Sequence, residues 1–344
     1  MPLKPNFLER FLINRGIIPG PLLDVGMSMF QSSALLTAGE IQLFNHLKSP
    51  LTLEEIGEKT KCSHQGLQIL IECLIHLGYI NKKENHYSLS KAMKDSLTIE
   101  LFPEMVPFFK FQIQKSADSH IAVRDNPPGG IVGWEFVKSG EIGKSYQTTM
   151  RWLASNTVDE VVSIIKFDAI PTKMLDIGGS HGLYCVKFCK KFQGLSATVL
   201  DWEIGLENAR QTLVQEEELA DRIDLFQCDF VEEDLPVGYD FVFLGNIIHG
   251  LTEEGNQKLF KKIAESTMKQ TTIAILDQFT NVKGSSFVKG VASLVGWNLF
   301  LFTGGKAYDF NAVKKWLEKC GFSSARLTHL RRSPGFSLLT AHKK

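Results

Sequence analysis

The chain has 344 residues, of which 44% are hydrophobic and 22% are charged, a composition typical of a folded globular protein with a sizeable core. Lys and Arg together number 38, as do Asp and Glu, so the formal net charge is zero. This balance gives no bulk attraction to nucleic acid or to an anionic membrane. Because we find neither a signal-peptide pattern nor an apolar stretch of bilayer length, we expect a cytoplasmic protein that binds no membrane and no nucleic acid.

Cysteine spacing gives no indication of a metal centre. None of the six cysteines forms a CxxC pair. Cys185 and Cys189 share one face of an expected helix, which favours reduced core thiols over a metal site. His and acidic residues do not stand at the close helical spacing of a zinc site, so we expect no catalytic metal.

Residues 1–100 are expected to form a mainly α-helical winged-helix domain. The pattern predicts a helix over 27–47, a second opened by a capping box of Thr52 and Glu55, a third over 67–77, and strands at 79–81 and 87–89. No Lys or Arg occurs between Lys61 and Lys82, which argues against a DNA-reading helix. The surplus of apolar residues instead predicts a homodimer held by this domain.

Residues 101–165 are expected to form a helical linker and a lid over a pocket. The segment is rich in Phe, Met and Trp, and residues 125–130 contain a Pro-Pro-Gly-Gly turn. Asn156 and Thr157 are expected to cap a helix that runs to Ile165. So many large apolar side chains between two domains favour a pocket for an aromatic ligand.

Residues 166–344 alternate between strand and helix patterns, which predicts an α/β domain with a mostly parallel sheet and helices on both faces. Strands are expected at 174–177, 197–200, 223–227, 240–244, 272–277, 324–330 and 336–341. Helices are expected at 183–193, 205–216, 253–268, 284–301 and 309–320.

The first of these strands leads into a glycine-rich turn. Gly178, Gly179 and Gly182 follow the apolar strand 174–177 and precede a helix. Asp201 ends the next apolar strand, where an acid can hold the hydroxyls of a ribose. Strand, glycine turn, helix and acid together predict a nucleotide-type binding site.

Other polar residues follow the later strands. Asp229 and Phe230 come after strand 223–227 and offer an acceptor and an aromatic face to an adenine. His249 follows strand 240–244, and Asp277 closes strand 272–277. Since ligands bind beyond the carboxyl ends of parallel strands, these side chains are expected at one edge of the sheet.

Five motifs follow one another along the chain: LDIGGSHG, VLDWE, CDF, DLPVGYDFVFLGNIIHGL and GGKAYDFNAVKKWLEKCGF. In this order they resemble the S-adenosylmethionine-dependent O-methyltransferases, most of all the caffeate, acetylserotonin and bacterial polyketide branch. The resemblance covers nearly the whole chain and implies a Rossmann-like methyltransferase domain with a seven-stranded sheet behind a winged-helix dimerisation domain. It implies His249 as general base with Asp277 as its orienting partner. The implied cofactor contacts are Asp176, Gly178, Gly179, Gly182, Asp201, Asp229, Phe230 and Asn246. The expected substrate contacts are Met150, Asn156, Asn298 and Phe302.

Three positions depart from the family pattern. Ser180 replaces the third glycine of DxGGGxG, Gly250 and Leu251 replace the Asp and Trp after the histidine, and Ala307 stands where many members carry Glu. The expected function is methyl transfer from S-adenosylmethionine to a hydroxyl of a small aromatic molecule. A C- or N-methyltransferase, a non-methylating enzyme of the same fold and a winged-helix ligand sensor are the alternatives.

Overall fold

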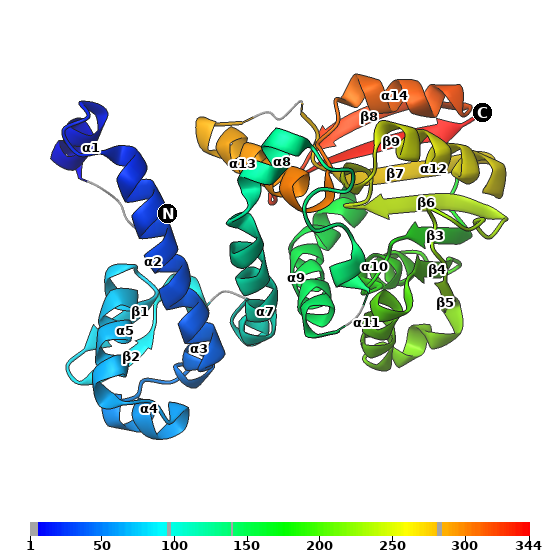
Figure 1. Cartoon of the computed structure of the whole chain (residues 1–344). Coiled ribbons are helices and arrows are strands. Elements are labelled where there is room, and N and C mark those ends of the chain that lie inside the picture. The colour runs from blue at the N-terminus through cyan, green and yellow to red at the C-terminus, as the bar shows by residue number, and fades with distance from the viewer. Residues whose placement is uncertain (1–5, 95–97, 139, 281–283) are drawn as a thin grey trace. The chain divides into compact units, whose positions relative to one another are not determined.

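The computed structural model describes residues 6–94, 98–138, 140–280 and 284–344, and its chain divides into two compact units, Met1–Lys110 and Phe111–Lys344 (Figure 1). Helix α7 (Thr98–Ser116) runs across the division. The expected three-part scheme, with boundaries after residues 100 and 165, stays a prediction.

The first unit is mostly helical and contains a two-stranded antiparallel hairpin. Its elements are α1 (Phe7–Asn14), α2 (Gly20–Glu40), α3 (Leu43–His46), α4 (Leu53–Thr60), α5 (His64–His76), β1 (Ile80–Lys83), β2 (His86–Leu89) and α6 (Lys91–Lys94). The capping box at the start of α4 is confirmed: the backbone N–H of Glu55 donates to Thr52 Oγ1, and that of Thr52 donates to Glu55 Oε2. The helix expected over 27–47 is wrong in its bounds, because Gln42 adopts a left-handed φ of 53° that ends the helical path.

The second unit contains the expected seven-stranded sheet, in the order β5-β4-β3-β6-β7-β9-β8. Its strands are β3 (Lys173–Ile177), β4 (Ser196–Asp201), β5 (Ile223–Gln227), β6 (Tyr239–Gly245), β7 (Thr267–Asp277), β8 (Phe322–His329) and β9 (Ser337–Lys343). The first five pair in parallel, and β9 runs antiparallel between β7 and β8. This confirms a mostly parallel sheet.

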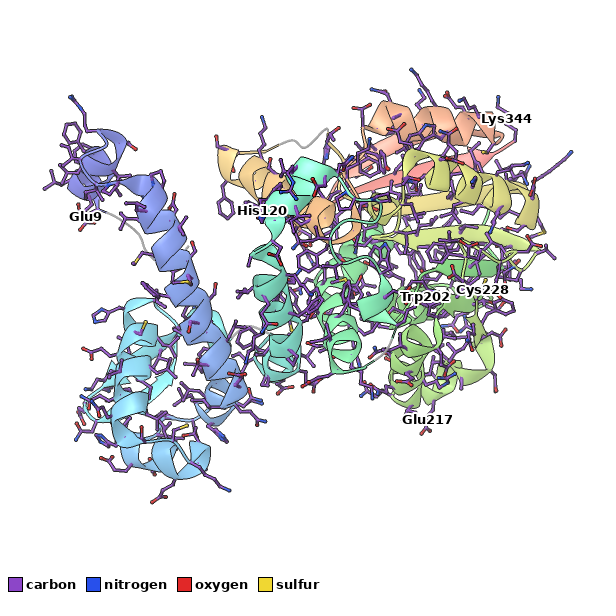
Figure 2. The ribbon with its side chains drawn as sticks, viewed as in Figure 1. Glu9, His120, Trp202, Glu217, Cys228 and Lys344 are labelled. Atoms are coloured by element: carbon purple, nitrogen blue, oxygen red, sulfur yellow. The ribbon has the colours of Figure 1, made fainter. Side chains whose placement is uncertain are left out.

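Helices cover both faces of this sheet (Figure 1). The helices of the second unit after α7 are α8 (Ser119–Asp125), α9 (Gly140–Ile164), α10 (Leu183–Lys191), α11 (Glu203–Val214), α12 (Glu253–Ser266), α13 (Ser286–Thr303) and α14 (Phe310–Lys319). One apolar core joins α9, α10 and α11 to one face, and a second joins α12 and α14 to the other. Figure 2 shows side chains filling both layers.

Helix α9 differs from the expectation at its centre. Asn156 and Thr157 do not cap a new helix, because α9 runs through them. Asn156 Nδ2 donates to the carbonyl oxygen of Trp152 and Thr157 Oγ1 to that of Ala154, so both side chains bond back within the helix.

The connection pattern determines where a ligand can bind. From β3 the chain passes to β4 and β5 on one side of the sheet, whereas β6 and β7 lie on the other side. The strand order therefore reverses between β3 and β6. Such a switch point opens a crevice beyond the carboxyl ends of the strands. The turns after Ile177 and Gly245 lie at this crevice.

Helix α13 corrects one expectation from the sequence. By length and composition alone it could cross a membrane, so an apolar stretch of bilayer length does exist in the described chain. The last turn of α13 is packed within the second unit, where Leu301, Phe302 and Thr303 are buried. That the protein binds no membrane stays a prediction.

Candidate active site

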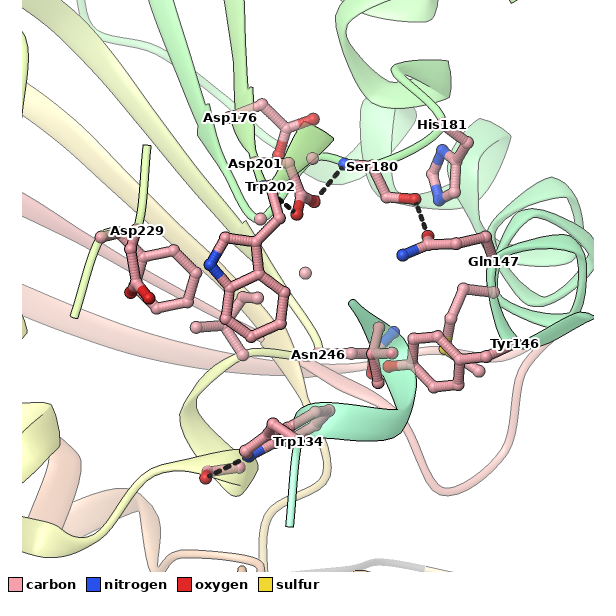
Figure 3. A pocket seen from close by; sticks show the side chains of 18 of the residues that line it. Trp134, Tyr146, Gln147, Asp176, Ser180, His181, Asp201, Trp202, Asp229 and Asn246 are labelled. Carbon is pink, nitrogen blue, oxygen red and sulfur yellow. Dashed lines mark hydrogen bonds between the residues drawn. The ribbon is translucent and has the colours of Figure 1, made fainter. Parts of the chain in front are cut away.

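A cavity of about 280 Å³ lies at the crevice between β3 and β6 (Figure 3). The predicted site residues that line it are Asp176, Gly178, Gly179, Asp201, Asp229, Phe230, Asn246 and Met150. The predicted site residues outside its lining are Gly182, His249, Asp277, Asn156, Asn298 and Phe302. Residues from four strand ends and from α9 therefore meet at one place, as the parallel topology requires.

The glycine turn presents bare backbone to the cavity. Gly178 has a φ of 68°, and a Cβ there would lie 2.3 Å from Cδ1 of Ile247. A Cβ on Gly179 would lie 2.7 Å from the carboxyl carbon of Asp176. A side chain at either position would collide with the floor of the cavity, so both positions require glycine.

Two carboxyl groups lie beneath this turn. Asp201 accepts hydrogen bonds from the backbone N–H groups of Ser180 and Trp202, at 2.8 and 2.7 Å. Burial raises the pKa of Asp201 to about 6 even though these two bonds lower it. Burial also raises the pKa of Asp176 to about 7, with a smaller rise from the charge of Asp201, while the Cys185 thiol lowers it. Ionising both carboxyl groups at the floor of the cavity is therefore unfavourable in the folded protein.

Aromatic and acidic groups form one end of the cavity. Asp229 Oδ1 accepts from the backbone N–H of Val231 at 3.1 Å, and Phe230 lines the wall beside it. Trp202, directly after Asp201, adds an indole that Figure 3 shows next to Asp229. This end offers an acceptor and flat apolar faces, which suit a purine.

Trp134 packs against Gly250, one of the positions that depart from the family pattern. A Cβ on Gly250 would lie only 2.5 Å from Cζ2 of the Trp134 ring. The indole Nε1 donates to the carbonyl oxygen of Gly250 at 3.4 Å (Figure 3). The ring and Gly250 both line the cavity. An aspartate at position 250 is therefore incompatible with this position of Trp134.

His249 and Asp277 are brought together next to the cavity. Nδ1 of His249 lies 2.6 Å from Oδ1 of Asp277, which is fully buried. The same carboxylate accepts from the backbone N–H groups of His249 and Gln278. Ile247, two residues before His249, and Gly250, directly after it, line the cavity, and the imidazole is 10% exposed. With Nδ1 engaged, Nε2 is left to exchange a proton.

The backbone of His249 is held from the opposite side. A Cβ on Gly305 would lie 2.1 Å from the His249 carbonyl oxygen, and the Lys306 N–H donates to that oxygen at 3.0 Å. The GGK segment therefore fixes the turn that carries the histidine.

Three of the four expected substrate contacts lie elsewhere in the second unit. Asn156 is exposed on α9, and Asn298 Oδ1 accepts from Nε2 of Gln112 at 3.3 Å. Phe302 packs in a small apolar cluster with Ala122 and Leu301. Of the four, Met150 lines the cavity. The roles of all four as acceptor contacts stay predictions.

The sequence did not single out Gln147 or Trp202, which line the cavity, and it placed Trp134 only in an aromatic-rich segment that could line a pocket. A signal existed for Trp202, because it immediately follows the acid at a strand end. Trp134 lies in a turn segment and Gln147 on the long helix α9, and neither position carries a motif. Only the folded chain brings them to the crevice.

The described part of the chain holds free cysteines but no cluster of metal ligands. No group of three or more His, Cys, Asp or Glu side chains there could hold a metal ion. Cys185 and Cys189 are free and buried, as expected for core thiols. That the reaction needs no metal stays a prediction.

Comparison with known proteins defines the class. Residues 129–323 match the family described as O-methyltransferase domain, and residues 26–94 match the O-methyltransferase dimerisation domain. The chain belongs to the O-methyltransferase family, and it is an S-adenosylmethionine-dependent methyltransferase. This membership sets aside the alternative of a winged-helix ligand sensor.

The relatives compared below are distant, but each matches over at least 90% of both chains. The chain is 22% identical to 3-hydroxy-5-methyl-1-naphthoate 3-O-methyltransferase of Streptomyces sahachiroi, over 95% of both proteins. It is also 22% identical to the tetracenomycin polyketide synthesis 8-O-methyl transferase of Streptomyces glaucescens, over 90% of this chain and 93% of the relative. Human N-acetylserotonin methyltransferase, solved with S-adenosylmethionine, superposes with a TM-score of 0.77 at 16% identity, over 100% of this chain and 99% of that one. At this identity the structural match shows a shared fold.

Proposed function

We propose that this enzyme methylates the hydroxyl of a small aromatic molecule, with His249 as general base. The hydrogen bond between His249 and the buried Asp277, one residue from the cavity wall, carries this proposal. A hydroxyl is a weak nucleophile until its proton is removed, and an imidazole held by a carboxylate suits this task near neutral pH. The names of the relatives, which include a naphthoate 3-O-methyltransferase, support an aromatic acceptor.

The cavity fits the cofactor part by part. Asp201 would accept hydrogen bonds from the ribose hydroxyls, and Asp229 would accept one from the adenine amino group. Phe230 and Trp202 supply apolar faces for the base. The bare backbone of Gly178 and Gly179 allows the close approach that a side chain would prevent.

The remaining predicted cofactor residues support this cavity in different ways. Asp176 forms its floor, and Asn246 lines it with a φ of 60° and a backbone N–H bonded to the Leu276 carbonyl oxygen. Gly182 has a φ of 67° and is the N-cap residue of α10, so it shapes the turn from outside the lining. We propose direct contacts for Asn246 and a structural role for Gly182.

The reaction requires the chain to place a hydroxyl and remove its proton. When bound, S-adenosylmethionine supplies an electrophilic methyl group. Asp277 would keep the proton of neutral His249 on Nδ1, so that the Nε2 lone pair faces the incoming hydroxyl proton. Trp134, Met150 and Leu251 line the cavity and would exclude water and hold a flat acceptor.

The departures at Gly250 and Ala307 favour one alternative. Both positions lack an acid that many relatives carry near the base, so transfer to carbon or nitrogen, or a reaction without methyl transfer, is the second candidate. It keeps the same cofactor and the same cavity.

The dimerisation domain supports a homodimer, which we propose to form through the first unit. Helices α1 and α2, with the segment that joins them, expose an unusual number of large apolar side chains: Phe7, Leu8, Phe11, Ile17, Leu22, Val25, Met29 and Phe30. Such a surface is typical of an interface. We propose a cytoplasmic enzyme whose partners are a second copy of itself and a small molecule, with no part for nucleic acid or a membrane.

Product analysis tests the function. The enzyme is incubated in EDTA with S-adenosylmethionine carrying a ¹³C-methyl group and with hydroxylated naphthoates and other phenols. We expect a ¹³C-methoxy carbon in the product spectrum. Methyl carbon bonded to ring carbon or to nitrogen would favour the alternative, and activity lost in EDTA and restored by Mg²⁺ would contradict a metal-free base mechanism.

A further inference from the structure

Gln147 is a buried polar side chain on the wall of the cavity. It stands on α9 and is only 3% exposed, and its Oε1 accepts a hydrogen bond from Ser180 Oγ. Figure 3 shows the bonded oxygen on the side of Ser180 and the amide nitrogen on the side of the cavity. In the described part of the chain no acceptor bonds to this nitrogen. Because this nitrogen faces the cavity, a ligand group bound there can accept its hydrogen bonds.

Ser180 is the residue that departs from the glycine pattern. Its φ of 40° lies in the left-handed region, which a serine enters at a cost and a glycine does not. Its backbone N–H donates to Asp201 and its hydroxyl bonds to Gln147. The serine therefore links the acid of the cavity floor to the amide of its wall, and a glycine could make only the first of these bonds.

The order of side chains along the cavity shows which ligand group reaches Gln147. In Figure 3, Asp229 lies at one side, Asp201 in the middle, and Gln147 with His181 at the other side. If the adenine lies at Asp229 and the ribose at Asp201, the amino-acid end of the cofactor extends toward Gln147. That end carries a carboxylate, which accepts hydrogen bonds.

A second N–H donor lies beside the first. Nδ1 of His181 accepts from the backbone N–H of Leu183 at 3.2 Å, so the ring proton resides on Nε2. Burial lowers the pKa of His181 to about 3, with a smaller contribution from Arg151, so the ring is neutral at pH 7. This end of the cavity therefore offers neutral N–H donors to an anion.

We infer that Gln147 donates its amide N–H to the α-carboxylate of the bound cofactor, and that Ser180 is a positioning residue that holds this amide. The inference rests on the assignment of Asp201 and Asp229 in the proposed function. It gives the serine at the third glycine position a specific role in this chain.

Calorimetry with two ligands tests the inference. S-adenosylhomocysteine has the carboxylate, whereas 5′-methylthioadenosine has the same nucleoside without the amino-acid end. Q147L replaces the amide group by an apolar side chain of similar size, and we expect S-adenosylhomocysteine to bind about ten- to a hundredfold more weakly. The affinity for 5′-methylthioadenosine should stay at the wild-type value, which also reports that the variant is folded.

Variants of Ser180 test the positioning role. S180A and S180G should each weaken S-adenosylhomocysteine several-fold when Gln147 is present, and should have no further effect in a Q147L background. S180T keeps a hydroxyl and should retain most of the affinity. Independent, additive effects of the two positions would overturn the positioning role.

Other outcomes overturn the inference in distinguishable ways. Wild-type affinity of Q147L for S-adenosylhomocysteine, or an equal loss for both ligands, would show that Gln147 does not meet the carboxylate. R151Q is the control, because Arg151 is a cation near His181 that does not line the cavity. If R151Q weakened the binding of S-adenosylhomocysteine and Q147L did not, the contact with the carboxylate would be assigned to Arg151. If the wild-type protein bound neither ligand, the assignment of the cavity itself would be wrong.

Discussion

Nδ1 of His249 lies 2.6 Å from Oδ1 of Asp277, and this aspartate is fully buried at the end of β7. Its two oxygens also accept the backbone N–H groups of His249 and Gln278, so the carboxylate cannot rotate without breaking three bonds. A fixed acceptor at Nδ1 selects one tautomer of the imidazole. Residues 28 positions apart in sequence are thus joined because β6 and β7 are parallel neighbours.

D277N should lower the methyl-transfer rate by about tenfold to a hundredfold, because an amide can present either an N–H or an oxygen to Nδ1 and no longer selects the tautomer. The double variant H249A/D277N should be no slower than H249A alone, since the aspartate acts through the histidine. Steady-state rates of the three variants check this. Additive losses would mean that Asp277 contributes independently.

D176N should change how stability depends on pH. The raised pKa of Asp176, about 7, means that the folded state keeps a proton that the unfolded chain releases above about pH 4. This carboxyl group therefore makes the wild-type protein less stable as pH rises from 4 to 7. The free energy of unfolding of D176N, minus that of wild type, should therefore increase by about 2 kcal/mol from pH 5 to pH 7.

Urea unfolding at the two pH values measures this difference without cofactor. D224N is the matched control, because it removes one carboxylate from an exposed position of β5. The same stability difference between D176N and wild type at both pH values would show that Asp176 is ionised in the folded protein.

G250A should cost about 1–3 kcal/mol of stability, because its Cβ would overlap the Trp134 ring. In a W134A background the same substitution should cost little, since the colliding ring is gone. G290A is the control: a Cβ there meets nothing within 4 Å, and alanine in a helix is neutral or stabilising. Equal effects of G250A with and without Trp134 would remove the steric explanation.

Light scattering should give twice the chain mass of 38.6 kDa at micromolar concentration. M29E places a charge on the exposed apolar face of α2 and should shift the mass toward the monomer. Q68E adds the same charge at an exposed polar position of α5 and should leave the dimer intact. A monomeric wild-type protein would end the dimer proposal.

The sequence was sufficient for the parts of the site that follow directly from a strand. The glycine turn after β3, Asp201 at the end of β4 and Asp277 at the end of β7 could all be placed, because the carboxyl ends of parallel strands share one edge. Their proximity follows from the topology alone.

The remaining wall could not be predicted in this way. Trp134 reaches the cavity because the backbone N–H groups of Ile131 and Gly133 bond to carbonyls at the end of α13, a pairing across more than 160 residues with no sequence marker. Which face of α9 meets the sheet also depends on packing, so Met150 lines the cavity whereas Asn156 on the same helix does not.

The most direct test of the account is the single-turnover rate of methyl transfer by H249A on an accepted phenol, with cofactor affinity measured in parallel by calorimetry. We expect the rate to fall by about a hundredfold or more while cofactor affinity stays near wild type, because the imidazole lies outside the lining of the cofactor cavity. A near-normal rate in H249A would contradict His249 as the base that removes the hydroxyl proton.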